Sequence, residues 1–156
     1  MMLRLFFVFL ISCFCITYSY NIFALDQMIP ASAGIVDPDY NDCVFDADGS
    51  VSSISSSCYL FFNIPYSTGT YDVNSITSYY YDNSGSQRMS IYFRSHSISS
   101  TGSYSTISST SDTSTSSSVQ SKTLSFSTTD IASTSYFYYI RLVLDDGTKL
   151  LGIKIN

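Results

Sequence analysis

Apolar and polar residues alternate along most of this chain, with the period of two that is typical of a strand with one buried face. In residues 88–95, Met89, Ile91 and Phe93 fall on one face, and mainly polar residues fall on the other. Residues 135–144 alternate with the same period but carry apolar residues on both faces. This pattern predicts a one-sided strand in the first segment and a central strand in the second.

The same reasoning predicts about eight strands, separated by turns. The expected strands cover residues 26–32, 43–45, 51–64, 73–81, 88–95, 119–127, 135–144 and 148–155. The first is expected at a sheet edge, because Pro30 cannot donate a hydrogen bond to a neighbouring strand. Residues 82–87 and 145–147 are rich in turn formers, so we expect a hairpin around each of them.

Two polar stretches interrupt this pattern. Residues 36–42, with the sequence VDPDYND, are predicted to form a loop because Asp, Asn and Pro favour turns. Residues 97–118 consist almost entirely of Ser and Thr, with few large apolar residues. We expect an exposed edge strand there, followed by a mobile loop at residues 112–117.

Three consecutive tyrosines, Tyr79, Tyr80 and Tyr81, end one predicted strand. With a period of two, Tyr80 points to one face and its two neighbours point to the other. The run therefore does not form a single three-ring platform. We expect the rings to pack across neighbouring strands.

The composition supports strands over helices. There is no Glu, and Ser, Thr, Tyr, Ile and Val suit a pleated, half-buried surface. A disordered stalk is disfavoured, because aromatic residues make up 16% of the chain and Pro occurs only three times. We predict an all-β fold, a two-sheet antiparallel β-sandwich of jelly-roll type, with a closed barrel as the alternative.

The N-terminus has the layout of a secretory signal peptide, predicted to span residues 1–24. Arg4 precedes an apolar run over residues 5–16, and Ala24 is the preferred last residue, with Ser19 as the second choice. The run is shorter than the roughly 20 residues that span a membrane. An alternative is lipid attachment at Cys13, which would anchor the product.

The remaining residues, 25–156, are predicted to form one β-sandwich domain that is secreted, either extracellular or in the cell envelope, without a stable membrane span. The formal net charge is −5, with seven Lys and Arg against twelve Asp. This balance argues against a nucleic-acid partner, which requires clustered cations. Cys43 and Cys58 are predicted to form a disulfide in an oxidising compartment, and two buried free thiols are the alternative.

Several motifs occur in a distinctive order: MIPASAG at 28–34, FDADGS at 45–50, YYYDN at 79–83, MSIYFRS at 89–95, and YFYYIRLVL followed by LLGIKI at the C-terminus. In this order the chain resembles a group of small, secreted, uncharacterised bacterial β-sandwich proteins. The resemblance covers roughly residues 28–155 and departs at IPYSTGTYDV, residues 64–73. It implies a fold and a location, and its motifs include no catalytic signature.

Catalysis is not predicted from the sequence. The only histidine is His96, and no serine lies in a G-x-S-x-G motif. Five aspartates could supply a carboxylate pair for glycoside hydrolysis, and this leaves an unrecognised hydrolase as an alternative. They are Asp37, Asp39, Asp42, Asp46 and Asp48. Their turn-like surroundings favour a structural role.

The same region could hold a structural calcium ion through Asp37, Asp39, Asp46 and Asp48. If Asp46 is position 1 of an EF-hand loop, position 12 is Ser57, whereas an EF-hand loop needs Glu there. No other cofactor is indicated.

Binding is the predicted function. Tyr66, Tyr71 and Tyr104 lie in loops or polar stretches, where exposed rings could stack on sugars, although the chain contains no Trp. We expect a non-catalytic binding or adhesion module for a surface component such as a glycan. The alternative is a structural envelope or matrix protein that self-associates through strand edges. The sequence identifies neither the ligand nor the oligomeric state.

Overall fold

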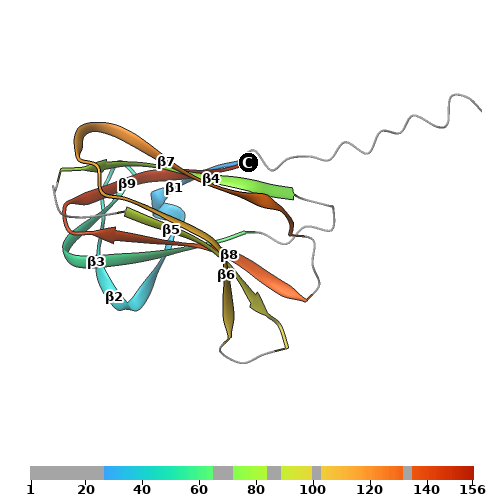
Figure 1. Ribbon diagram of the computed structural model, residues 1–156. Helices are drawn as coiled ribbons and strands as arrows, with labels where there is room; N and C mark the ends of the chain where they lie inside the picture. The colour runs from blue at the N-terminus through green and yellow to red at the C-terminus, as the bar shows by residue number, and fades with distance from the viewer. Residues whose placement is uncertain (1–26, 65–71, 84–88, 100–102, 132–134) are drawn as a thin grey trace, which may run out of the picture.

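The strands pack face to face in two layers (Figure 1). The computed structural model describes residues 27–64, 72–83, 89–99, 103–131 and 135–156. This part of the chain contains β1 (Gln27–Pro30), the 3-10 turn η1 (Ala31–Ala33), β2 (Ile35–Phe45), β3 (Val51–Asn63), β4 (Asp72–Asp82), β5 (Met89–Ser97), β6 (Tyr104–Asp112), β7 (Ser116–Asp130), β8 (Tyr136–Asp145) and β9 (Thr148–Ile155). The predicted all-β antiparallel sandwich is confirmed.

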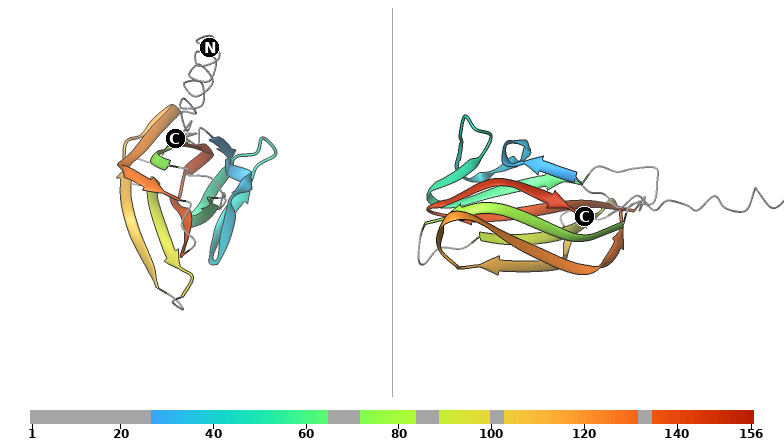
Figure 2. Two further views of the ribbon diagram at one scale, coloured as in Figure 1. Left: turned by 90° about the vertical axis from the view of Figure 1, so that its right-hand side faces the viewer. Right: turned by 90° about the horizontal axis from the view of Figure 1, so that it is seen from above.

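The first layer has the strand order β2-β3-β8-β5-β6, and the second layer has the order β1-β9-β4-β7. The end-on view shows the two layers enclosing the core (Figure 2). The layers are continuous at one end, where Val51 and Ser52 of β3 pair with Leu150 and Lys149 of β9. All these pairings are antiparallel, so each layer can present one face to the core and one to solvent.

Both hairpins predicted around the tight turns are wrong in their pairing, although their strands exist. β4 pairs with β7 and β9, whereas β5 pairs with β6 and β8. In the same way β8 belongs to the first layer and β9 to the second. β4 and β8 are flanked by strands distant in sequence, so the connections that follow them lead from one layer to the other. Such crossings are typical of a jelly roll.

The core is made of the inward faces of both layers. Leu60, Ile91 and Leu142 from the first layer and Ile76 and Ile153 from the second are fully buried in one cluster. Each such side chain contributes about 1.5–3 kcal/mol by its burial.

The predicted alternation in the tyrosine run is confirmed. Tyr80 is fully buried, while Tyr79 and Tyr81 are partly exposed on the opposite face of β4. The outward pair lies on the second layer, and the buried ring joins the core.

The loop predicted at residues 36–42 is instead part of β2. This strand lies at the edge of the first layer and pairs with β3 alone among the described strands. The missing N–H of Pro38 therefore removes no hydrogen bond to a second strand. Two register shifts flank Asn41 and accommodate the polar residues. The predicted disulfide between Cys43 and Cys58 is confirmed, with 5.0 Å between the Cα atoms.

The exposed edge strand expected in the Ser/Thr-rich stretch is confirmed as β6. β7 begins at Ser116, so the connection between the two strands is shorter than the expected loop. Within the described ranges, no helix is long and apolar enough to cross a membrane. The predicted signal peptide, residues 1–24, lies outside those ranges.

A bulge in β9 reverses the side that its residues face. Leu150 and Ile153 are both buried, and the pairing with β4 shifts between Tyr79 and Tyr80. Gly152 lies at this bulge, opposite Pro30 of β1. A Cβ atom on Gly152 would lie 2.7 Å from the carbonyl oxygen of Ile29. Glycine therefore permits the close approach of β1 to β9.

Candidate functional site

Two neighbouring strands of the first layer carry the same triplet, a tyrosine, a buried apolar residue and an arginine. The triplet reads YFR in β5 and YIR in β8. The antiparallel register places Tyr92 opposite Arg141, and Arg94 opposite Tyr139. The two tyrosines and two arginines therefore form a reciprocal set of cross-strand pairs on the outer face of this layer.

Tyr92, Arg94 and Arg141 of this set also belong to a longer row of neighbouring rings and guanidinium groups, which we call the Tyr–Arg row. It crosses the first layer from β2 to β6 and contains Tyr40, Tyr59, Arg141, Tyr92, Arg94 and Tyr104.

The first half of the row is closely stacked. The ring centroids of Tyr40 and Tyr59 lie 4.1 Å apart, with an angle of 19° between the ring planes. The guanidinium carbon of Arg141 lies 4.1 Å from the Tyr59 centroid and 5.7 Å from the Tyr92 centroid. Arg141 is thus positioned between two rings by cation–π attraction.

The second half repeats the arrangement around Arg94. Its guanidinium carbon lies 4.9 Å from the Tyr92 centroid and 4.2 Å from the Tyr104 centroid. Arg94 is only 7% exposed, whereas Tyr104 is 54% exposed at the end of the row. The two arginines are therefore held in place largely by aromatic neighbours.

Within the described residues, neither arginine has a carboxylate partner. The Nε atoms of Arg94 and Arg141 are buried and have no hydrogen-bond partner. Elsewhere, two lysines form ion pairs: Lys122 Nζ lies 3.9 Å from Asp112 Oδ2, and Lys149 Nζ lies 3.2 Å from Asp46 Oδ2. In the described part of the chain, Arg94 and Arg141 make no such ion pair.

A shallow depression of about 240 Å³ lies along the row. It is lined by Ser57, Tyr59, Ser90, Tyr92, Arg141, Val143 and Asp145. The Ser57 hydroxyl donates a hydrogen bond to Asp145 Oδ1 at 2.9 Å. The lining combines hydroxyl, guanidinium and carboxylate groups, so it can both donate and accept hydrogen bonds to a hydrated ligand.

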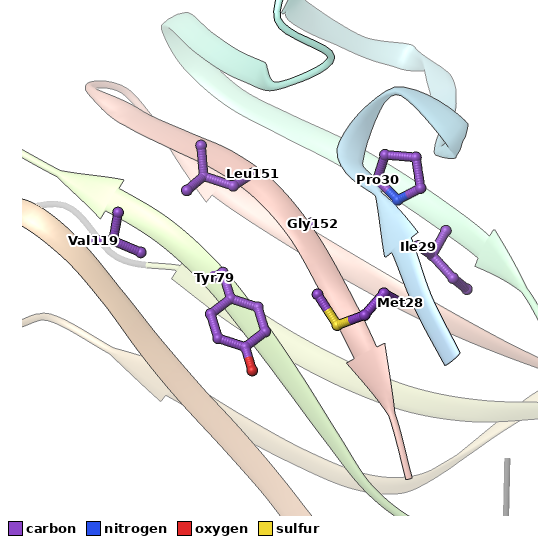
Figure 3. A pocket seen from close by; sticks show the side chains of 7 residues that line it. All are labelled: Met28, Ile29, Pro30, Tyr79, Val119, Leu151 and Gly152. Atoms are coloured by element: carbon purple, nitrogen blue, oxygen red, sulfur yellow. The ribbon is translucent and has the colours of Figure 1, made fainter. Parts of the chain in front are cut away.

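The outer face of the second layer has a different depression, of about 450 Å³ (Figure 3). It is lined by Met28, Ile29, Pro30, Tyr79, Val119, Leu151 and Gly152. Figure 3 shows these residues distributed over β1, β9, β4 and β7, with Met28 and Tyr79 next to each other. Because the lining is almost entirely apolar, this hollow offers contact area but few directed hydrogen bonds.

Of the three predicted ligand-binding tyrosines, one lies within the described residues. Tyr104 lies at the β6 end of the Tyr–Arg row, with its ring against Arg94. Tyr66 and Tyr71 lie outside the described residues. The other row members were not identified from the sequence, although the repeated Tyr-x-Arg triplet was a visible signal for four of the residues on this face.

The aspartates proposed as calcium ligands are in two different settings. Asp37 and Asp39 lie on β2, where the Asp39 backbone N–H donates to Asp37 Oδ1 at 3.0 Å. Asp46 and Asp48 lie in the turn between β2 and β3, where both contact Lys149. Among the described residues, no group of three or more His, Cys, Asp or Glu side chains could hold a metal ion.

The turn carboxylates have lowered pKa values. Hydrogen bonds from Ser52, then Lys149, lower the pKa of Asp46. Hydrogen bonds from Ser50, then Lys149, lower the pKa of Asp48 to about 2. These contacts stabilise the charged forms and tie the turn to β9, so the observed role of the pair is to hold the turn.

No family model matches the chain, and no curated protein matches it. Solved structures with a similar fold include CsCBM6-3 of Clostridium stercorarium in complex with cellobiose, at 14% identity and a TM-score of 0.54, covering 85% of this chain and 95% of that one. A second is a family 6 carbohydrate-binding module, at 11% identity and a TM-score of 0.53, with coverage of 85% and 95%. A third is the C-terminal module of the laminarinase LamC of Zobellia galactanivorans, at 14% identity and a TM-score of 0.50, with coverage of 83% and 98%. These similarities concern the fold.

Proposed function

We propose that this chain is a non-catalytic glycan-binding module, secreted or displayed at a cell surface, that binds its ligand along the Tyr–Arg row. Two solved structures of similar fold are described as carbohydrate-binding modules, and one of them was solved in complex with cellobiose. The signal-like residues 1–24 support the location.

The observation that carries the proposal is the polar depression beside the row. Sugars present many hydroxyl groups, which both donate and accept hydrogen bonds, together with apolar ring faces. Arg141 offers N–H donors, Asp145 offers acceptors, and Ser57, Ser90 and Tyr92 offer hydroxyl groups of both kinds. This lining matches the chemistry of a sugar better than the apolar hollow on the opposite face.

The row is also rigid enough to recognise a ligand. Its rings and guanidinium groups hold one another in position on regular strands, so little side-chain entropy remains to be lost on binding. Tyr92 is central, because it contacts both arginines of the row.

The test is a glycan array followed by titration calorimetry with the glycans that bind. Tyr92→Ala is expected to weaken binding about tenfold or more, because it removes a ring from the centre of the site. The matched control is Tyr79→Ala, which removes a partly exposed ring from the opposite outer face. Its affinity is expected to stay within about twofold of the unmodified protein.

Two outcomes would contradict the proposal. One is the absence of binding to any glycan by a folded protein. The other is an equal loss of affinity in the two variants, which would place the binding site elsewhere.

A further inference from the structure

We infer that the Tyr–Arg row recognises carboxylate groups, so that its ligand is an acidic glycan containing uronic acid units. This inference rests on the proposed glycan-binding function and adds the class of sugar.

The first step concerns how the arginines are held. The guanidinium carbon of Arg141 lies over the rings of Tyr59 and Tyr92, and that of Arg94 lies over the rings of Tyr92 and Tyr104. The face of an aromatic ring offers a guanidinium group no oxygen acceptor, so these contacts leave its N–H donors available. The aromatic neighbours therefore orient these cations without satisfying their hydrogen bonds.

The second step concerns the missing counter-charge. Arg94 and Arg141 are diagonal neighbours on adjacent strands, and their guanidinium carbons lie 4.9 Å and 5.7 Å from the same Tyr92 centroid, so they are at most about 11 Å apart. Two like charges at this separation repel each other, and their cost is greatest where water is partly excluded. The chain contains twelve Asp, yet within the described segments none forms an ion pair with either arginine.

Asp145 does not change this balance. It lies four residues from Arg141 along β8, which corresponds to about 13 Å at the usual rise per residue. Its carboxylate accepts a hydrogen bond from Ser57, which lines the same depression. Within the described residues, the charge of Arg94 and Arg141 is thus left for a ligand to compensate.

The third step concerns the kind of anion. A guanidinium group presents parallel N–H donors that match the two oxygens of a carboxylate, and such paired hydrogen bonds are among the strongest in proteins. The neighbouring hydroxyl groups of Ser90 and Tyr92 suit the hydroxyl groups of the same sugar. A uronic acid combines both groups in one ring.

The test compares a panel of uronate oligosaccharides with their methyl esters by titration calorimetry. The two forms share one backbone and differ only in the carboxyl charge. The acid form is expected to bind about tenfold or more tightly than the ester, because hydrogen bonds to charged groups are the stronger ones. Raising the salt concentration should weaken binding of the acid and leave binding of the ester nearly unchanged.

Arg141→Gln is expected to lose this preference for the acid form while still binding the ester. Arg141→Lys keeps the charge but loses the paired donors, so it should retain part of the preference. The control is Lys122→Gln, which removes one charge from β7 in the second layer. Its preference should match that of the unmodified protein, and melting temperatures check that all variants fold.

Equal affinity for acids and esters would overturn the inference, as would a preference for sulfated over uronate oligosaccharides. In both cases glycan binding that depends on Tyr92 would leave the proposed function intact. If no glycan of any kind binds to the folded protein, the proposed function fails and the inference fails with it.

Discussion

The outer faces of the two layers differ in chemistry although they rest on the same core. The first layer presents the Tyr–Arg row and a polar depression, while the second presents an apolar hollow around Met28 and Tyr79. The inward residues of both layers belong to one buried cluster. The difference therefore lies in the outward residues, which the fold leaves free to vary.

The two depressions also differ in size, and the proposed site is the smaller one. The apolar hollow, at about 450 Å³, is larger than the polar depression of about 240 Å³. The smaller depression is lined by Arg141, whose buried Nε has no hydrogen-bond partner among the described residues. Unsatisfied polar chemistry, rather than volume, distinguishes a binding face from a merely uneven surface.

The largest expected effect that separates the two faces comes from the disulfide. Replacing both Cys43 and Cys58 with Ala should lower the free energy of unfolding by about 3 kcal/mol, because their separation is 15 residues. Denaturant unfolding measures this loss. Hydrogen exchange should then quicken in β2, which carries Tyr40, while β1 and β9 of the second layer keep their relative protection.

Reduction of the unmodified protein serves as the control and should reproduce this loss. Equal quickening of exchange in both layers would show that the disulfide stabilises the whole sandwich, and not the Tyr–Arg row side in particular.

A smaller effect is expected on the opposite face. Gly152→Ala places a methyl group against the Ile29 carbonyl, so β1 must move away from β9. We expect a loss of about 1–3 kcal/mol in unfolding free energy and faster hydrogen exchange in β1. Leu151→Ala, at the neighbouring position of the same hollow, is the control that should leave β1 in place.

Glycan affinity at the Tyr–Arg row should not change in Gly152→Ala. A parallel loss of affinity would mean that the outer faces of the two layers are coupled through the core.

The smallest effect concerns the turn that joins β2 and β3. The folded pKa of Asp48 is about 2, below its ordinary value of 3.8, so its contribution to stability is present above about pH 4 and is lost as the pH falls towards 2. Asp48→Asn should therefore flatten the fall of Tm between pH 4 and pH 2. Because the group is exposed, the change will be small.

Thermal unfolding across this pH range is the measurement, with Asp39→Asn on β2 as the charge-matched control. A pH profile that is the same in Asp48→Asn and the unmodified protein would show that the contacts of Asp48 with Ser50 and Lys149 do not stabilise the turn.

Local alternation correctly predicted which side chains point inward. Met89, Ile91 and Phe93 are buried as the pattern in residues 88–95 indicated, and Tyr80 is buried between outward neighbours. These assignments depend only on the two-residue period within each strand.

Pairing could not be predicted in the same way. The neighbours of β4 and β8 come from distant parts of the chain, so the tight turns gave a misleading indication of hairpins. The phase change in β9 depends on a bulge against β4 and on the approach of β1 to Gly152. The polar residues of β2 form a strand because they pair with the edge of β3.

The Tyr–Arg row was missed for the same reason. Each Tyr-x-Arg triplet is visible in the sequence, but its meaning depends on β5 lying beside β8 in one register. Tyr104 was identified as exposed, whereas its contact with Arg94 depends on the pairing of β5 with β6.

The reciprocal register of β5 and β8 has a consequence for how this protein can evolve. If the pairing register of these strands shifted by one residue, Arg94 and Arg141 would face the apolar core and isoleucine side chains would face solvent. The same register therefore determines both the packing of this layer and the side chains of the proposed binding site. Within that constraint, descendants could exchange the outward tyrosines and arginines for other residues and acquire new specificities on an unaltered scaffold.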